Sequence, residues 1–215
     1  MPLKSAQPRG IPKLFGASPV SSEEEDSLLM EQVKRGDRAA FDRLYEKYRR
    51  PIMSFLNTMI SDRDVVDEIF QETFLKLFRA REAYEKRAKF TTFLWTIARN
   101  TALDWIAKKK ETRAVTGEPD ADGEAGIDAI AQLESELPDA ERALIDHLDE
   151  RAIADCVSRL SESDRLLCGL RMHSELAYEE IAEQLKMPIG TVKTKLHRIR
   201  EKLARCFRAK QGEVG

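Results

Sequence analysis

A cluster of long basic side chains near the C-terminus has the composition of a nucleic-acid contact surface. Residues 186–210 contain nine Lys and Arg residues and one acid. They follow a short amphipathic segment that begins near Tyr178 and is broken at Pro188, which is helix-turn-helix spacing. A helix about 10–12 Å across fits the major groove, where Lys and Arg bind guanine edges or phosphates. The pattern predicts a duplex DNA reader, and the alternative is an amphipathic hairpin with a solvated basic face.

The second helix of this predicted reader divides into an apolar stripe and a donor face. Ala182 is small enough to let the two helices cross closely, and Thr191 stands at the helix start, where backbone N–H groups favour a phosphate. The expected shared core is Ile181, Leu185, Val192, Leu196 and Ile199. The candidate DNA-binding residues are Thr191, Lys193, Thr194, Lys195, His197 and Arg198.

Groups that could catalyse a reaction or bind a metal are few. The chain has three His and three Cys residues. Cys168 and His173 are five residues apart, outside the i, i+4 spacing that brings two ligands to one helix face. The cysteines are odd in number and form no CxxC pair, which suits a reducing cytoplasm. We therefore expect no enzyme activity, no metal and no cofactor, and a cytoplasmic location.

The formal net charge of -2 hides a strong segregation of charge along the chain. Residues 27–110 carry 18 basic and 12 acidic side chains, and residues 111–150 carry 2 basic and 13 acidic ones. Two basic segments thus flank an acidic connector. Basic clusters suggest phosphate backbones as partners, although solvated helix faces would have a similar composition.

Periodicity predicts an all-α protein of two small helical domains joined by a flexible acidic linker. Residues 1–22 lack periodicity and are expected to be a disordered tail. A capping box of Ser22 and Glu25 precedes a helix that stops at Gly36, and a second helix spans about 38–48. Pro51 can open a third helix, because proline is favoured at a first helical turn. Further helices are expected over about 64–81 and, capped by a threonine, over about 91–110.

The remaining chain is assigned to a linker and a C-terminal domain. Residues 111–143 are acidic and contain scattered Gly and Pro, so we assign them to the linker. The C-terminal domain, 144–210, should contain helices over about 144–160, 161–173, 178–185 and 190–208, the last two forming the helix-turn-helix. No run of 18 apolar residues occurs, so no membrane insertion is expected.

Two further segments resemble a known family. Residues 68–79, EIFQETFLKLFR, are similar to the helix with which bacterial sigma factors bind the polymerase clamp. Residues 90–105, FTTFLWTIARNTALDW, resemble the sigma element that melts and reads the −10 promoter element. The C-terminal reader follows in the family's order. The chain is therefore identified as resembling an extracytoplasmic-function (ECF) sigma factor of the sigma-70 family, with region 2 at 23–110 and region 4 at 144–210.

The resemblance implies which residues capture the melted −10 strand. Asn100 and the loop at 84–89 would hold a flipped base, because an Asn side chain offers both a donor and an acceptor to a base edge. Tyr84 could stack on a base, whereas Trp95 could stack or belong to the core. The full implied set is Tyr84, Lys86, Arg87, Lys89, Trp95, Arg99, Asn100, Lys108 and Lys109.

The resemblance also implies a polymerase-binding set on the helix at 64–81. Its members are Asp67, Glu68, Phe70, Gln71, Glu72 and Phe74. Acids there would also stabilise the helix dipole, which is the alternative. Phe70 departs from the family, which has a small aliphatic residue before the Gln-Glu pair. The basic character of the loop at 84–89 leaves the preferred −10 base open.

The implied function is that of a sigma factor, which catalyses nothing itself. Its partners would be core RNA polymerase, through the clamp and flap, and promoter DNA, with an anti-sigma factor as inhibitor. The acidic linker would either enter the RNA channel or act as a simple tether. The alternative is an autonomous helix-turn-helix regulator that works without polymerase. That alternative explains the C-terminal reader but leaves residues 68–79 and 90–105 without a role.

Overall fold

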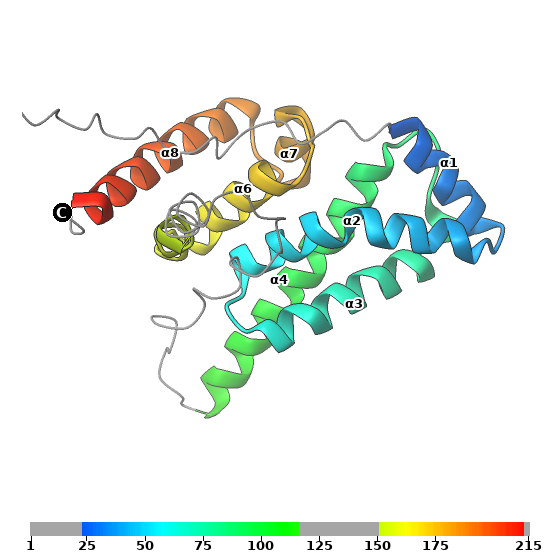
Figure 1. Ribbon diagram of the computed structural model, residues 1–215, viewed down its shortest axis with the longest axis horizontal. Coiled ribbons are helices and arrows are strands. Elements are labelled where there is room, and N and C mark those ends of the chain that lie inside the picture. The colour runs from blue at the N-terminus through cyan, green and yellow to red at the C-terminus, as the bar shows by residue number, and fades with distance from the viewer. Residues whose placement is uncertain (1–22, 117–150, 213–215) are drawn as a thin grey trace, which may run out of the picture.

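The computed structural model describes residues 23–116 and 151–212, and within these ranges it contains helices and no strand. Two lobes lie side by side (Figure 1). The N-terminal lobe comprises α1 (Glu23–Lys34), α2 (Arg38–Met59), α3 (Arg63–Arg79), the short 3-10 helix η1 (Arg81–Ala83) and α4 (Phe90–Thr116). The C-terminal lobe comprises a helix at 151–158, α6 (Glu162–His173), α7 (Tyr178–Gln184) and α8 (Ile189–Gly212). The all-α prediction is confirmed.

Helix starts and stops follow local signals in the sequence. Gly36 ends the first helical segment with φ +89, a left-handed conformation that glycine adopts at little cost. Asp37, Asp62 and Ser161 are the N-caps of α2, α3 and α6, each accepting a hydrogen bond from a backbone N–H of the first turn. The predicted tail at 1–22 and nearly all of the predicted linker lie outside the described residues.

The prediction of a helix break at Pro51 is wrong. α2 runs through this residue without interruption from Arg38 to Met59. A proline inside a helix removes one backbone hydrogen bond and costs about 3 kcal/mol. The apolar face around it compensates, because Leu44, Ile52 and Phe55 are fully buried. Packing overrides the local signal at this position.

The long helix α4 begins at Phe90 and ends at Thr116, a little beyond the predicted range. Its start is capped from another helix rather than by a threonine of its own. The Glu23 carboxylate of α1 accepts hydrogen bonds from the Phe90 and Thr91 backbone N–H groups and from the Thr91 hydroxyl. A carboxylate at a helix N-terminus also stabilises the helix dipole. α1 thus fixes the start of the segment assigned to −10 recognition.

The helix-turn-helix forms as predicted. Ile181, Val192 and Ile199 are fully buried between α7 and α8. The turn closes where the Met187 backbone N–H donates to the Ala182 carbonyl over 2.9 Å. Lys186 takes φ 51, the left-handed conformation common just after a helix end.

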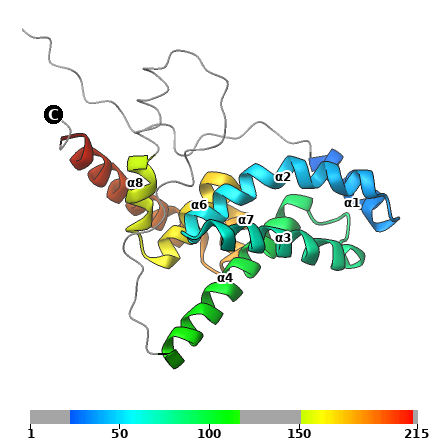
Figure 2. The ribbon, with the colours of Figure 1, turned by 60° about the horizontal axis from the view of Figure 1, so that its bottom comes forward.

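The two lobes share one continuous core. α6 packs along α2 in both views (Figures 1 and 2). Gly169 of α6 makes the approach possible, because a Cβ on it would lie 3.0 Å from the Phe55 ring and 3.3 Å from the Thr58 methyl group. Thr58 Oγ1 also lies 3.2 Å from His173 Nε2. The sequence predicted two separate domains and gave no expectation of this contact.

Candidate nucleic-acid interface

The exposed face of α8 presents most of the predicted duplex-reading side chains. Thr191, Lys193, Thr194, His197 and Arg198 are exposed. The Thr194 hydroxyl donates to the Gly190 carbonyl over 2.9 Å, and His197 Nδ1 lies 3.8 Å from the Glu201 carboxylate. These side chains all lie on α8, whose apolar residues pack into the core of the lobe. That arrangement leaves the donor face available to a DNA groove.

Lys195 is the exception among these residues. It is half-buried and its Nζ lies 3.2 Å from Ser163 Oγ and 4.0 Å from the Asp164 carboxylate. Lys202, about two turns further from the reading end, lies 2.8 Å from the same carboxylate. Asp164 therefore anchors α8 to α6. Lys195 contributes to the frame of the reader as well as to its charge.

The predicted −10 set is divided between exposed and buried positions. Lys86, Arg87, Lys89, Asn100 and Lys108 are exposed on the loop at 84–89 and on α4. Lys109 is half-buried, with its Nζ 5.0 Å from the centre of the Trp105 ring. The five exposed side chains are polar or cationic, as a single-strand channel requires.

Tyr84 and Trp95 lie in the core instead of presenting ring faces for stacking. Each is 1% exposed. The Tyr84 hydroxyl lies 2.9 Å from Ser27 Oγ and 3.1 Å from the Ala88 carbonyl oxygen, and burial raises the pKa of its phenol. Trp95 packs edge-on against Phe55. In this arrangement Tyr84 fixes the loop to the lobe, and Trp95 takes the core role left open by the sequence.

The start of α4 is covered by α7 of the other lobe. Arg99 donates to the Gln184 backbone carbonyl, and the Gln184 side-chain amide donates to the Thr92 carbonyl over 3.2 Å. The Thr92 hydroxyl donates to the Glu180 carboxylate over 2.9 Å, and Lys89 Nζ lies 3.2 Å from the same oxygen. Two residues of the predicted −10 set, Lys89 and Arg99, are thus bound by the helix-turn-helix.

Electrostatics at this contact follow from its partial burial. Desolvation lowers the pKa of the Arg99 guanidinium. Burial alone would raise the pKa of Glu180, but hydrogen bonds from the Ala177 backbone, Thr92 and Lys89 outweigh it and lower that pKa. Glu180 is consequently ionised near neutral pH while it holds the two lobes together.

The predicted polymerase-binding helix has a mixed surface. Asp67, Glu68 and Gln71 are exposed and Glu72 is half-buried, whereas Phe70 and Phe74 are 3% and 2% exposed. The two phenylalanines pack against Tyr45 of α2, so in this conformation they support α3 from below. This burial contradicts their predicted place on the contact surface.

Two apolar side chains of α3 are exposed, and neither belongs to the polymerase-binding set predicted from the sequence. Leu75 is 43% and Phe78 is 41% exposed. Leu75 lies four residues after Gln71 and Phe78 lies seven after it, so all three lie near one helix face. An apolar residue away from the buried face of its helix, as at Leu75, was the signal available in the sequence. Phe78 is partly covered by Phe41.

The described residues also bear on metal binding, thiol reactivity and membrane spanning. No group of three or more His, Cys, Asp or Glu side chains within 23–116 and 151–212 could hold a metal ion. Cys168 is fully buried, and desolvation raises the pKa of its thiol to about 12. None of the helices described is long and apolar enough to cross a membrane.

Acidification should loosen the packing of α6 on α2. Desolvation lowers the pKa of His173 to about 4, against 6.5 for an exposed histidine. Below pH 6.5, His173 binds a proton when the lobes are separated but stays neutral when they are packed. Packing is therefore strongest above this pH and weakens towards pH 4. We expect the ratio of separated to packed molecules to rise up to about tenfold between pH 7.5 and 5.5. Fluorescence energy transfer between lobe-specific labels measures it, and His173→Gln should abolish the pH response in that range.

Two family matches cover the two lobes. Sigma-70 region 2 matches residues 44–112, and Sigma-70 region 4 matches residues 150–203. The first match includes the whole −10 set and all of α3, and the second includes the helix-turn-helix. Fold and surfaces together thus define a promoter-reading initiation factor of the sigma-70 class.

Curated relatives narrow this class. The chain is 32% identical over 189 residues to RNA polymerase sigma-H factor of Pseudomonas aeruginosa, covering 86% of this chain and 95% of that protein. It is 30% identical to ECF RNA polymerase sigma-E factor of Haemophilus influenzae (82% and 92% covered) and 30% identical to ECF RNA polymerase sigma factor SigW of Bacillus subtilis (83% and 95% covered). The chain belongs to the ECF sigma factors of the sigma-70 family.

Solved structures agree with this fold. CnrH in complex with the cytosolic domain of CnrY matches with a TM-score of 0.60 at 17% identity, covering 86% of this chain and 98% of that one. The sigma factor RpoE in complex with the anti-sigma factor NepR from Bartonella quintana matches with a TM-score of 0.58 at 21% identity, covering 78% and 96%. As a member of the family, the protein binds core RNA polymerase and directs promoter-specific initiation, reading the −35 duplex and capturing the melted −10 strand.

Proposed function

We propose that the two exposed donor surfaces divide promoter recognition between the lobes. Thr191, Lys193, Thr194, His197 and Arg198 read the −35 duplex from α8. Asn100 captures a flipped −10 base, and the exposed cations Lys86, Arg87, Lys89 and Lys108 bind the backbone of the melted strand. The observation that supports this division most directly is the exposure of both sets on different lobes of one chain. The boundaries proposed for the domains are 23–110 and 144–210.

The polymerase contact is proposed to lie on the exposed face of α3. Asp67, Glu68 and Gln71 supply polar groups, and Leu75 and Phe78 supply apolar area among them. Interfaces combine apolar residues with a surrounding polar rim, and this surface has both. Phe70 and Phe74 act indirectly by holding α3 on α2. The C-terminal lobe is proposed to meet the polymerase flap.

An anti-sigma factor is proposed as a further partner. Of the two solved structures compared above, one contains a sigma factor bound to an anti-sigma factor, and the other contains CnrH bound to the cytosolic domain of CnrY. In this chain the lobes are already drawn together, with α7 over the start of α4. A protein that binds across both lobes would stabilise this arrangement and keep Lys89 and Arg99 from DNA.

Run-off transcription with purified core polymerase tests the proposed roles, on a promoter selected from a random library. Asn100→Ala should reduce initiation at least about tenfold, because it removes the donor and acceptor that hold the flipped base. Polymerase binding, measured by gel filtration, should not change. Asn57→Ala on α2 is the matched control and should initiate normally.

The same experiment distinguishes a sigma factor from an autonomous regulator. Specific duplex binding by the chain alone, without polymerase association or initiation, would contradict the roles proposed for both the −10 set and α3. Normal initiation by Asn100→Ala would remove only the base-capture role.

A further inference from the structure

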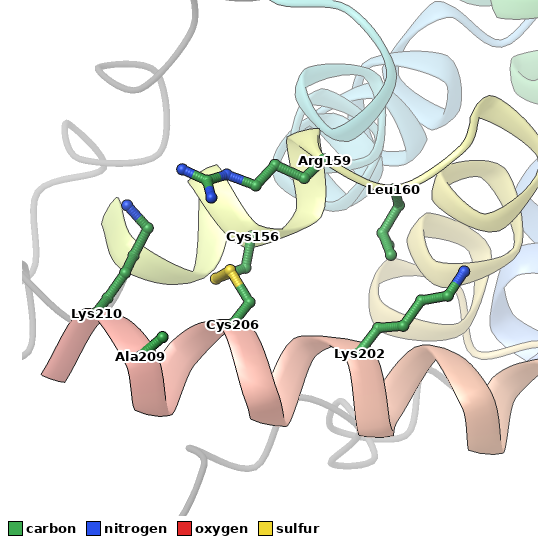
Figure 3. Close-up of a pocket in the computed structure, with 7 residues that line it drawn as sticks. All are labelled: Cys156, Arg159, Leu160, Lys202, Cys206, Ala209 and Lys210. Atoms are coloured by element: carbon green, nitrogen blue, oxygen red, sulfur yellow. A yellow bond between two sulfur atoms is a disulfide. The ribbon is translucent and has the colours of Figure 1, made fainter. Parts of the chain in front are cut away.

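A disulfide joins two helices of the C-terminal lobe. Cys156, on the helix at 151–158, is bonded to Cys206 of α8, with the two Cα atoms 5.8 Å apart and 50 residues between them in sequence (Figure 3). Cys156 is 3% exposed, and Cys206 is half-buried. The odd number of cysteines and their spacing had suggested reduced thiols, so this pairing is a correction of the sequence-based interpretation.

The bond lies beside a pocket lined by three cations, each of which is paired with a carboxylate just outside the lining. The pocket has a volume of about 320 Å³ and is lined by Cys156, Arg159, Leu160, Lys202, Cys206, Ala209 and Lys210 (Figure 3). Arg159, Lys202 and Ala209 are exposed, so the pocket opens to solvent. The lining contains three cations and no acid. Asp155, just outside it, lies 3.0 Å from Arg159 and 2.6 Å from Lys210.

Cys206 is the better placed of the two sulfurs to react. Lys202 and Lys210 stand four residues before and four after it on α8, which places all three side chains on one helix face. Neighbouring cations stabilise a thiolate, the form of cysteine that attacks electrophiles. Cys156 is deeper in the lobe and within bonding reach of Cys206, which is the position of a resolving thiol.

We propose that Cys156 and Cys206 form a reversible oxidation site for small hydroperoxides in the promoter-reading lobe. The Cys206 thiolate attacks the peroxide oxygen and the O–O bond breaks, so that Cys206 becomes a sulfenic acid, and the leaving hydroxide or alkoxide takes a proton from solvent to give water or an alcohol. The Cys156 thiol then attacks the Cys206 sulfur, and the S–O bond breaks to release water. The peroxide receives the two electrons that the thiol pair loses, and a dithiol reductant regenerates the two thiols by thiol–disulfide exchange while it is itself oxidised to a disulfide.

The bond should govern the stability of the lobe that reads the duplex. It connects the beginning of that lobe to the helix that carries the reading face, and it closes a long loop, which restricts the unfolded chain. Reduction is therefore expected to lower the melting temperature of the C-terminal lobe by roughly 10 °C or more. Duplex binding would then survive to a higher temperature after oxidation than after reduction.

Cys168 provides an internal comparison. It is fully buried in α6, and burial raises the pKa of its thiol to about 12. It is therefore expected to remain unreactive under conditions that modify the pair. A non-selective oxidation would not distinguish the three cysteines in this way.

The first test is site-resolved labelling of the reduced full-length chain. Iodoacetamide in native buffer should modify Cys206 fastest and Cys168 least. Brief hydrogen peroxide should block labelling of Cys206 and produce the Cys156–Cys206 peptide with a loss of two hydrogens by mass spectrometry. Lys202→Gln with Lys210→Gln should slow both reactions severalfold, whereas Arg205→Gln with Arg208→Gln, on the same helix outside the pocket lining, should not. Over-oxidation of Cys206 or preferential reaction of Cys168 would overturn the proposal.

The second test measures the consequence. The wild type is compared with Cys156→Ser and Cys168→Ser, each after peroxide and after dithiothreitol. Melting temperature and −35 duplex affinity, the latter taken between the two wild-type melting points, should depend on redox state in the wild type and Cys168→Ser. Cys156→Ser should lose this dependence. A bond that forms but changes neither quantity would make the pair a passive cross-link and overturn its role in the stability of the duplex-reading lobe.

Discussion

Lys193→Ala combined with Arg198→Ala should weaken binding to the −35 duplex by about 30-fold or more. Both side chains are exposed on α8, beyond the apolar stripe that holds the helix in its lobe. A good bidentate base contact discriminates by about 1–3 kcal/mol, so losing two such contacts costs at least about 2 kcal/mol. Fluorescence anisotropy with the selected promoter, in the presence of core polymerase, measures the change.

A matched control separates position from charge. Arg205→Ala with Arg208→Ala removes two positive charges from exposed sites on the C-terminal half of α8. These sites lie about 10 Å or more along the helix from Arg198, at about 1.5 Å per residue. We expect the control to weaken binding only slightly. If the two double variants lost affinity equally, general attraction to phosphates would explain binding, and the reading face would have to be reassigned.

The salt dependence of each variant adds a second measurement. A side chain that contacts phosphate releases counterions, and its removal lowers the slope of log affinity against log salt by about one. A side chain that reads a base relaxes the preference at one promoter position instead. The two roles of Lys193 and Arg198 can therefore be assigned one residue at a time.

The helix-turn-helix could be predicted from the sequence because its signals are local. Val192, Leu196 and Ile199 recur at helical spacing, and Pro188 separates their helix from the one that carries Ile181. Each of these signals acts within a few residues, and the structure places these apolar side chains in the core. The exposed reading face then follows from the helical period, except at Lys195, where a contact with another helix decides the orientation.

Errors in the prediction arose where distant contacts override local signals. Pro51 normally marks a helix start, but the apolar residues around it keep α2 intact. Tyr84 belongs to a polar loop, yet Ser27 and Phe90 enclose its ring and hydroxyl. No residue close in sequence to Pro51 or Tyr84 indicates which distant residues pack against them.

The most important features absent from the prediction are pairings over long sequence distances. Cys156 and Cys206 are 50 residues apart, and no spacing rule connects them. The contact between the lobes joins Phe55 to Gly169, and its only sequence signal was a glycine within an otherwise regular helical pattern. Such a glycine is unfavourable in a helix by about 1 kcal/mol, which indicates a packing requirement.

Gly169→Val should separate the lobes. A Cβ on Gly169 would already lie 3.0 Å from the buried Phe55 ring, and two further methyl groups cannot be accommodated without moving α6 from α2. Overpacking of this kind costs about 1–3 kcal/mol, which corresponds to roughly 5- to 150-fold in the ratio of separated to packed molecules. Valine has a higher helix propensity than glycine, so α6 itself should not be weakened.

Small-angle scattering and single-strand binding measure the two consequences of this change. Lobe separation should increase the radius of gyration and withdraw Glu180 and Gln184 from Lys89, Thr92 and Arg99. Affinity for a −10 non-template oligonucleotide should then rise, because the strand no longer competes with α7 for these groups.

Gly190→Val is the matched control for scattering, since a Cβ at Gly190 would meet nothing within 4 Å. It should leave the radius unchanged. An unchanged radius in Gly169→Val would show that α6 can shift within the packed state. A larger radius without higher strand affinity would show that α7 covers the start of α4 without limiting access to it. Only a rise in both quantities makes the close packing of α2 and α6 the barrier to −10 recognition.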